Sequence, residues 1–257
     1  DVDRSRGLGD VYKRQVVAFA AAGFFLGGLL KGVVGMGLPL VAIPIVAIVM
    51  PVAKAIPLML ASGYVMNLLQ VRQTWHARTS LVPWLPVIAG ISMGLAVGVY
   101  FATSAPEDLV RGVLGTVVLI YVGLSVAKLE LPPSFVRRPF AGLSMGWLTG
   151  LSGGMTGGFG ATLAMYLLAC DLGKDRFVWL IGIIMFIGSI VLSICLAAAG
   201  NLNSEQLLGS VAVLLPSWLG LTAGGYVRRT VSQTVFKNIA LAALAIMGAS
   251  LIASAII

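Results

Sequence analysis

Two glycine-rich stretches interrupt the most apolar segments of this chain. The first reads "KGVVGMGLP" from Lys31 to Pro39, and the second reads "SGGMTGGFG" over residues 152–160. A helix that breaks and restarts exposes backbone N–H groups at the start of its second half, where the helix dipole adds positive charge. Glycine lets a ligand approach the backbone closely, and proline is tolerated early in a helix. The two stretches therefore predict an anion-binding site.

The candidate substrate-binding residues all come from these stretches, which supply one cation, one proline, two hydroxyl groups and six glycines. Lys31 has two interpretations of equal weight. It caps the first half-helix or snorkels, as a cation near a helix C-terminus often does, or its ammonium group faces the path of an anion. The candidates are Lys31, Gly35, Gly37, Pro39, Ser152, Gly153, Gly154, Thr156, Gly157 and Gly158.

The residues needed for other kinds of chemistry are missing. Between Asp10 and Glu107 the chain has no acidic residue, and the later carboxylates lie near expected loops. Sodium or proton symporters commonly hold Asp or Glu within their helices, and metal transporters carry His or Cys clusters. The single histidine, His76, has no acid nearby in the sequence to orient it. We therefore expect no catalytic residue, no metal site, no cofactor and no enzyme activity.

The composition identifies the environment in which these stretches must fold. Of 257 residues, 59% are hydrophobic and only 10% are charged, whereas a soluble domain is about a quarter charged. Several continuous apolar runs reach the roughly 20 residues that cross a bilayer as a helix. The sequence predicts an all-α polytopic membrane protein. Its net charge of +8 arises from cations in short loops, which orient membrane proteins, so we expect no nucleic-acid partner.

Two of the expected membrane segments are too long for one crossing. As continuous helices, 16–50 and 139–170 would each span about 50 Å, against a hydrocarbon core of about 30 Å. Each contains one of the glycine-rich stretches and is better interpreted as two half-helices, either a re-entrant hairpin or two short spans. The expected spans are 16–50, 53–71, 82–103, 107–128, 139–170, 175–198, 205–227 and 231–256.

The two halves of the chain resemble each other. "GLLKGVVG" (28–35) matches "GWLTGLSG" (146–153), and "MGLAVGVYF" (93–101) matches "LGLTAGGYV" (219–227), followed by a weaker match between 109–115 and 235–241. Three matches in the same order indicate an internal duplication. We divide the chain into a disordered or non-native tail 1–15, a first membrane repeat 16–128, a linker 129–138 and a second repeat 139–257.

The loop charges distinguish two topologies. If all eight spans cross once, the basic residues divide almost evenly between the two sides. If both broken spans return to the side they entered from, the basic loops 72–78, 128–138, 171–176 and 228–237 share one side, which the positive-inside rule makes cytoplasmic. Each repeat then crosses an odd number of times, so the second is inverted. Inverted repeats with a broken first helix and three further transmembrane helices are typical of alternating-access transporters.

Several features also have a purely structural explanation. Glycines four residues apart, at 94/98 and 220/224, are more typical of close helix packing than of ligand binding. The polar residues Ser62, Asn67 and Ser189 lie inside expected helices, where such residues more often join helices than bind ligands. Cys170 and Cys195 form no metal or redox pattern and are expected to be small core residues.

At the two glycine-rich stretches the chain resembles the TauE/SafE sulfite exporter family, also called the toluene sulfonate uptake permeases. The matching segments are "GLLKGVVGMGLPLVAIP" and "GWLTGLSGGMTGGFGATLA". The first block departs from the family in reading GMG for a glycine triplet, and the second lacks the usual proline. The resemblance, which covers residues 16–257, implies transport of sulfite, sulfonates or other small organosulfur anions. It places the substrate near Gly35, Gly37, Pro39, Gly153, Gly154, Gly157 and Gly158.

The function expected from the sequence is a secondary transporter of small anions in a bacterial-type inner membrane, with the lipid bilayer and the anion as its partners. A passive anion channel and a non-transporting membrane scaffold subunit remain as alternatives. The sequence leaves the oligomeric state, the coupling ion and the direction of transport open.

Overall fold

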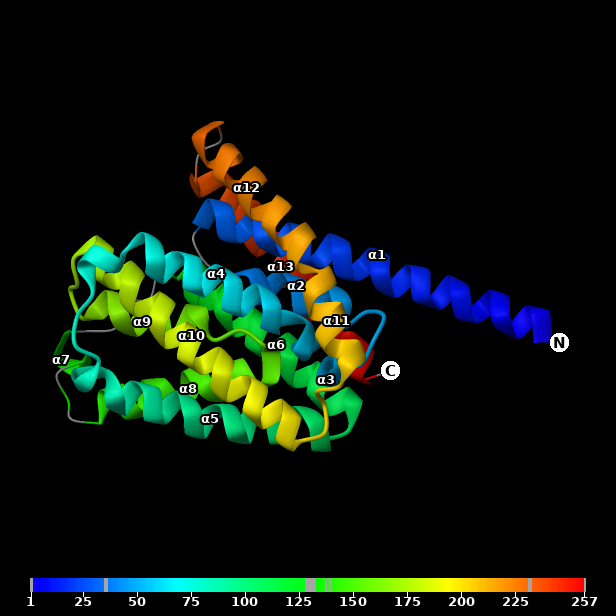
Figure 1. The fold of residues 1–257 in the computed structure, drawn as a ribbon, viewed down its shortest axis with the longest axis horizontal. Helices are drawn as coiled ribbons and strands as arrows, with labels where there is room; N and C mark the ends of the chain where they lie inside the picture. Colours follow the sequence, from blue (N-terminus) through cyan, green and yellow to red (C-terminus); the bar gives the residue numbers. More distant parts are fainter. Residues whose placement is uncertain are drawn as a thin grey trace.

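The computed structural model describes residues 2–34, 37–127, 133–136, 138, 140–230 and 233–256, and over these residues all regular structure is helical. The helices form one bundle, and the N-terminal part of α1 projects beyond it (Figure 1). The helices are α1 (Val2–Val34), α2 (Leu38–Val46), α3 (Val52–Ala55), α4 (Met59–Gln73), α5 (Leu85–Ser104), α6 (Glu107–Val126), α7 (Pro133–Val136), α8 (Ala141–Thr156), α9 (Gly160–Ala169), α10 (Lys174–Ala198), α11 (Ser204–Ala212), α12 (Leu214–Thr230) and α13 (Gln233–Ile256), with 3₁₀ turns at Ile56–Leu58, Trp75–Ala77 and Val82–Trp84.

Six segments of the described chain are long and apolar enough to cross a membrane, by length and composition. Five of them agree closely with the expected spans 53–71, 82–103, 107–128, 175–198 and 205–227, and the sixth is the first half of the expected span 16–50. The chain is therefore a multi-pass membrane protein. The segments are Gln15–Val33, Val52–Gln73, Val82–Ser104, Glu107–Val126, Asp175–Ala198 and Ser204–Val227.

Both overlong spans are broken, as predicted, and both fold back as hairpins. In the first, a Cβ atom placed on Gly27 of α1 would lie 2.5 Å from the carbonyl oxygen of Leu38, at the start of α2. In the second, a Cβ on Gly142 near the start of α8 would lie 3.3 Å from the hydroxyl of Tyr166, near the end of α9. The second half of each span therefore runs back along the first half.

Close helix–helix contacts at glycines join the two halves of the molecule. Gly94 and Gly98 of α5 leave no room for a Cβ because the backbone of α8 passes directly over them. Gly220 and Gly224 of α12 meet the backbone of α1 in the same way. The packing role predicted for these two glycine pairs is confirmed. Close backbone approach of this kind holds membrane helices together when no hydrophobic force acts between them.

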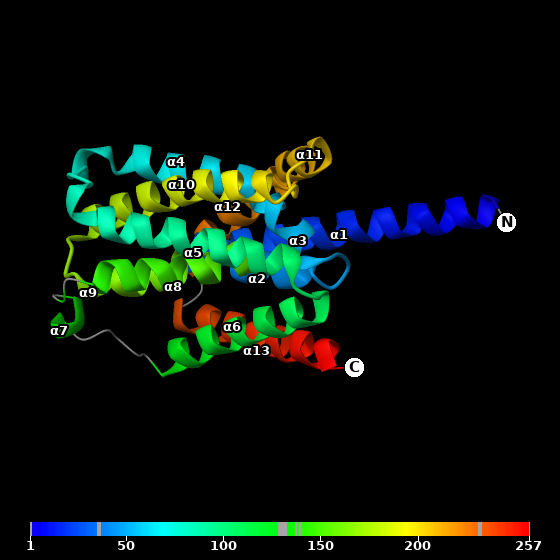
Figure 2. The same cartoon turned by 90° about the horizontal axis from the view of Figure 1, so that it is seen from below.

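The remaining long helices also pair across the two halves. Between α4 and α10, the hydroxyl of Tyr64 donates to the carbonyl oxygen of Ser189 at 3.1 Å and lies 2.7 Å from the hydroxyl of Ser193. Between α6 and α13, a Cβ on Gly115 would lie 2.6 Å from the carbonyl oxygen of Gly248. Figure 2 shows α6 and α13 side by side on one flank of the bundle, beneath the other pairs.

At each end of the bundle, a side-chain contact joins segments that are far apart in the sequence. At one end, Nε2 of His76 lies 3.0 Å from Oδ2 of Asp175, which joins the loop after α4 to the start of α10. The expectation that no acid would accompany His76 is therefore wrong, because the fold brings Asp175 to it from a distant part of the chain. At the other end, the backbone N–H of Val52 donates to Oε1 of Glu107 at 3.2 Å.

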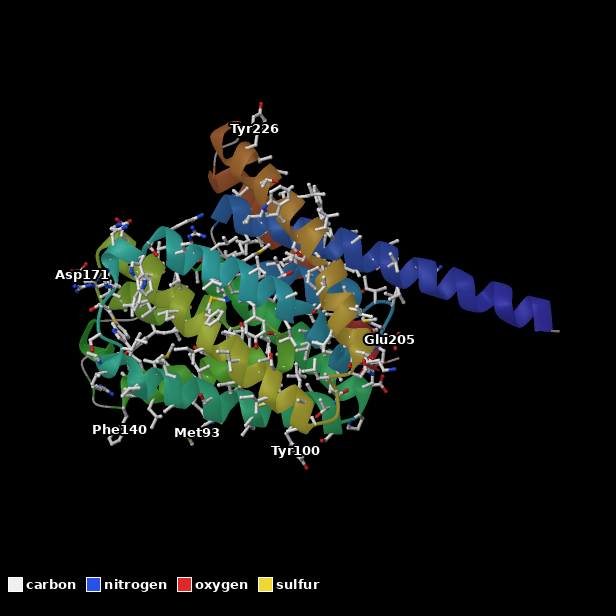
Figure 3. All side chains as sticks on the ribbon, viewed as in Figure 1. Met93, Tyr100, Phe140, Asp171, Glu205 and Tyr226 are labelled. Atoms are coloured by element: carbon white, nitrogen blue, oxygen red, sulfur yellow. The ribbon has the colours of Figure 1, made fainter. Side chains whose placement is uncertain are left out.

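The outside of the bundle is apolar along its length and charged at its ends. Met93, Tyr100 and Phe140 point outward from the flank formed by α5 and α8, whereas Asp171 and Glu205 lie at opposite ends (Figure 3). In a membrane protein the apolar flank faces lipid and the charged ends face water.

Two predicted spans contain interruptions that proline explains. The span 53–71 includes a 3₁₀ turn at Ile56–Leu58, and the span 205–227 is divided at Val213 into α11 and α12. Pro57 and Pro216 cannot donate the backbone hydrogen bond that a continuous helix would need there.

The ends of the predicted repeats are described only in part. Within the segment 1–15, which we expected to be a disordered or non-native tail, the structure continues α1 back to Val2. Its assignment as a tail stays a prediction. The predicted basic loops 128–138 and 228–237 lie partly outside the described residues.

Candidate anion site

The two helix breaks meet inside the bundle. Gly37, before α2, has φ 103°, and Gly157, after α8, has φ 69°. Both values lie in the left-handed region that favours glycine. A Cβ on Gly158 would lie only 2.6 Å from the Cβ of Pro39, so the two breaks touch directly. The two glycine-rich stretches, which are far apart in the sequence, therefore lie against each other in the fold.

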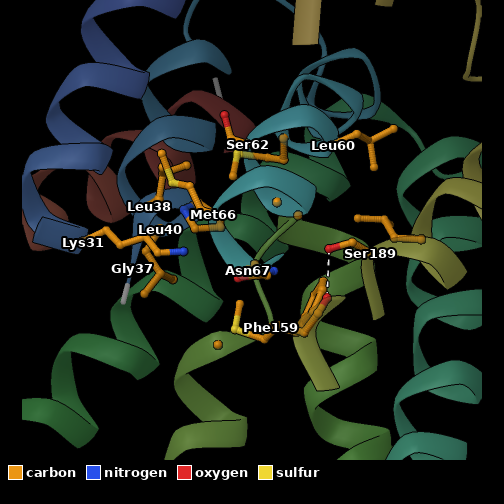
Figure 4. A pocket seen from close by; sticks show the side chains of 18 of the residues that line it. Lys31, Gly37, Leu38, Leu40, Leu60, Ser62, Met66, Asn67, Phe159 and Ser189 are labelled. Atoms are coloured by element: carbon orange, nitrogen blue, oxygen red, sulfur yellow. Dashed lines mark hydrogen bonds between the residues drawn. The ribbon is translucent and has the colours of Figure 1, made fainter. Parts of the chain in front are cut away.

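A cavity of about 50 Å³ lies beside this contact (Figure 4). This volume suffices for a few water molecules or one small ion. Its walls come from the two breaks and from α4 and α10, and most of its lining is apolar. The lining residues are Lys31, Gly37, Leu38, Pro39, Leu40, Met59, Leu60, Ser62, Gly63, Met66, Asn67, Gln70, Gly157, Gly158, Phe159, Gly160, Ile181, Met185, Ser189 and Leu192.

The N-termini of both second half-helices border the cavity. Gly37 and Leu38 at the start of α2, and Phe159 and Gly160 at the start of α9, are among its lining residues. Neither helix has a side-chain cap on its first N–H groups. These free N–H groups and the helix dipoles favour negative charge in the cavity.

Lys31 supplies the charge. It lies in the last turn of α1, and its side chain extends toward the cavity in Figure 4. Among the described residues that line the cavity it is the only charged one. No ion pair or hydrogen bond joins its side chain to another described residue. The ammonium group therefore borders the cavity, and its contact with a substrate stays a prediction.

Polar side chains on α4 and α10 complete the lining, and most of them already have partners. The hydroxyl of Ser62 lies 3.1 Å from that of Ser217, and the hydroxyl of Ser189 donates to the carbonyl oxygen of Met185 at 2.9 Å. Nε2 of Gln70 donates to the carbonyl oxygen of Val178 at 3.0 Å. Ser62 joins two helices, as the sequence analysis expected.

Asn67 is the exception among these polar residues. Its side chain is only 2% exposed, and its Oδ1 atom has no hydrogen-bond partner. Figure 4 shows its amide in the middle of the cavity wall, across from Lys31. We had expected Asn67 to join helices. The sequence alone does not reveal its position, because a single Asn inside a helix has no spacing pattern that separates a packing role from a binding role.

Gly153 and Gly154 lie in the second break but not in the cavity wall. A Cβ on Gly153 would lie 2.7 Å from the Phe159 side chain, and a Cβ on Gly154 would lie 2.6 Å from the backbone nitrogen of Val99 on α5. Gly35 lies outside the described residues. A direct contact between these three glycines and substrate stays a prediction.

The two hydroxyl groups of the second break form hydrogen bonds with backbone groups of α8 and of the break itself. Oγ1 of Thr156 donates to the carbonyl oxygen of Ser152 at 2.8 Å and lies 3.2 Å from the backbone nitrogen of Gly158. The hydroxyl of Ser152 donates to the carbonyl oxygen of Thr149 at 3.0 Å. In this conformation the hydroxyls stabilise the break, and their role as substrate donors stays a prediction.

No group of three or more His, Cys, Asp or Glu side chains lies close enough to hold a metal ion, within the part of the chain that the structure describes. The described lining of the cavity combines two helix N-termini, one lysine, one amide without a partner and apolar walls.

Comparison with known proteins agrees with this chemistry. Searches of curated proteins and of solved structures returned no match. The family model described as "Sulfite exporter TauE/SafE" matches residues 19–251, nearly the whole chain and both helix breaks. The chain therefore belongs to the TauE/SafE sulfite exporter family.

Proposed function

We propose that this protein is a secondary transporter of small anions, sulfite or organosulfur anions such as sulfonates, and that the anion binds in the cavity between the two helix breaks. The observation that carries the proposal is the position of Lys31, the one charged residue of the described cavity lining, beside two uncapped helix N-termini. An unpaired cation in an apolar membrane interior is costly unless a ligand or water pairs with it. A transported anion supplies that partner.

Alternating access of two inverted repeats is the proposed mechanism. The pairing of helices supports it. Helix α1 packs on α12 and α5 packs on α8, so the first helix of each proposed repeat contacts the third of the other, while α4 pairs with α10 and α6 with α13. A pseudo-two-fold axis in the membrane plane would produce this exchange. Rocking of one repeat against the other would then expose the cavity to each side in turn.

We propose a bacterial-type inner membrane as the location, with the loops 72–78, 128–138, 171–176 and 228–237 in the cytoplasm. The contact between His76 and Asp175 supports a common side for two of these loops, and the basic residues Arg72, Arg78 and Arg176 belong to the same end. The opposite end carries Glu107, Asp108 and Glu205 with Lys54, which fits the positive-inside rule.

Counterflow into proteoliposomes tests the proposed function and separates it from its rivals. Vesicles loaded with unlabelled sulfite should take up radiolabelled sulfite faster than empty vesicles, because an alternating-access carrier returns faster when it is loaded. A passive anion channel predicts no such acceleration. A scaffold subunit predicts no protein-dependent uptake at all.

A further inference from the structure

Building on the proposed function, we propose that the cavity takes one small monovalent sulfur oxyanion at a time, held between the ammonium group of Lys31 and the side-chain amide of Asn67, and that it rejects divalent anions. The substrate class would then be hydrogensulfite and short-chain sulfonates, and sulfate and the sulfite dianion would be excluded.

The charge of the cavity lining favours a monovalent anion. Lys31 is the only charged side chain among the described residues that line the cavity, and no carboxylate accompanies it. A monovalent anion beside Lys31 forms a neutral pair. A divalent anion leaves one negative charge uncompensated in an apolar enclosure, which costs several kcal/mol even after relaxation of the protein. The helix N-termini offset only a fraction of a charge each.

The unpaired amide of Asn67 favours a ligand that forms hydrogen bonds with it. A buried polar group without a partner is destabilising, so an amide that is 2% exposed and has no partner for Oδ1 is expected to acquire one from a ligand. An amide both donates and accepts hydrogen bonds. An oxyanion accepts from its N–H groups, and a protonated oxyanion such as hydrogensulfite also offers an O–H group to its carbonyl oxygen. A sulfonate and a fully deprotonated dianion both lack this O–H group, so the contact with the Asn67 carbonyl oxygen favours hydrogensulfite alone, and charge separates sulfonates from dianions.

The size of the cavity limits the ligand to a small ion. About 50 Å³ accommodates an ion of a few heavy atoms. The walls around Lys31 and Asn67 include Met59, Met66 and Phe159, which suit the apolar side of a sulfonate or the sulfur atom of sulfite. An aromatic sulfonate would require the walls to move apart.

Equilibrium binding to the purified full-length chain tests the charge rule. The probe is radiolabelled sulfite at mildly acidic pH, where hydrogensulfite predominates, and the competitors are methanesulfonate, monovalent at every working pH, and sulfate, divalent throughout. We expect methanesulfonate to displace the probe and sulfate to be at least ~100-fold weaker. On raising the pH, sulfite affinity should fall further than methanesulfonate affinity, because sulfite alone gains a second negative charge.

Variants assign the two contacts. Lys31→Met should weaken sulfite binding about 10-fold to 100-fold, and Lys31→Arg, which keeps the charge, should retain the preference for methanesulfonate over sulfate. Asn67→Ala should weaken sulfite binding about 2-fold to 10-fold. The matched controls are Lys54→Met, which removes a cation outside this cavity, and Gln73→Ala, which removes an exposed amide from the end of α4; both should bind as the native chain does.

The possible failures are distinct. If radiolabelled sulfite binds but sulfate competes as well as methanesulfonate, the charge rule is overturned and the transporter proposal stands. If Lys31→Met and Asn67→Ala bind normally, the charge rule and the placement of the anion in this cavity are both overturned, and proteoliposome uptake alone decides whether the protein is a transporter. If sulfite neither binds nor enters proteoliposomes, the proposed function itself is overturned.

Discussion

The two helix breaks have the same shape and different chemistry. In both, a membrane helix ends, a glycine adopts a left-handed conformation and a second half-helix folds back along the first. When residues 28–35 are aligned with residues 146–153, Lys31 of the first break and Thr149 of the second occupy equivalent positions. Lys31 lines the cavity, whereas Thr149 is fully buried outside the cavity lining.

The difference indicates that the two breaks contribute different features to the cavity. The second break satisfies its own backbone through Thr156, which bonds to residues on both sides of Gly157. In the first break the cation Lys31 is left without a partner among the described residues. We infer that the first break supplies the charge of the site and that the second supplies a fixed wall against which Pro39 packs.

The largest effect is expected where the second break meets α5. Gly154→Leu places side-chain atoms where the backbone of Val99 already lies, since even a Cβ would be 2.6 Å from its nitrogen. Overpacking of this kind costs about 3 kcal/mol or more, so the variant should unfold at a lower temperature and lose uptake. Thermal unfolding in detergent measures it. The control is Gly225→Leu on α12, because a Cβ placed on Gly225 would have no neighbouring atom within 4 Å. This variant should unfold at the same temperature as the native chain.

Removing the charge from the first break should slow transport strongly without unfolding the protein. Lys31→Ala is expected to lower the rate of sulfite uptake about 10-fold to 100-fold at unchanged expression, because it removes a charged partner of the anion. Thr149→Ala removes the corresponding side chain of the second break and should leave uptake within about 2-fold. Equal uptake by Lys31→Ala and the native chain would return Lys31 to a capping role.

A smaller effect is expected from the cap of the second break. Thr156→Val keeps the shape of the side chain and removes its hydrogen bonds to Ser152 and Gly158. The free energy of unfolding should fall by about 1 kcal/mol, and sulfite affinity should fall only through loosening of the wall. Chemical denaturation and binding measure the two effects. A loss of affinity as large as that of Lys31→Ala would show that Thr156 contacts the anion directly.

The smallest effect is expected outside both breaks. Asp175→Asn removes the charge that faces His76 at one end of the bundle, in a pair whose two side chains are 66% and 59% exposed. Solvent screens such pairs, so stability should change by less than about 1 kcal/mol and uptake should stay the same. A large loss of uptake would assign this contact a role in gating.

The sequence was sufficient to locate the breaks and insufficient to complete the site. Glycine density and excessive length predict where α1 and α8 end, because both follow from local helix geometry and bilayer thickness. The pairing of helices from the two halves of the chain, such as α1 with α12, depends on close contacts between glycines and backbone that are far apart in the sequence. Asn67 reaches the cavity only through the packing of α4 on α10, so its role depends on tertiary structure.

Glycines of the same stretch have different surroundings, which the sequence does not distinguish. Gly157 and Gly158 border the cavity, while Gly153 and Gly154 of the same stretch contact Phe159 and α5. One turn of helix separates these two sets, and composition alone does not divide them.

Cross-linking the two breaks tests the central claim most directly. With Cys170 and Cys195 replaced by Ala, cysteines at Pro39 and Gly158 would have Cβ atoms about 1 Å closer than the ~3.8 Å of a typical disulfide, within reach of a small backbone adjustment. If the breaks form the transport site and must separate for alternating access, oxidation of the Pro39→Cys/Gly158→Cys variant should stop sulfite uptake and reduction should restore it. Uptake by the fully cross-linked protein at the rate of its reduced form would contradict the account.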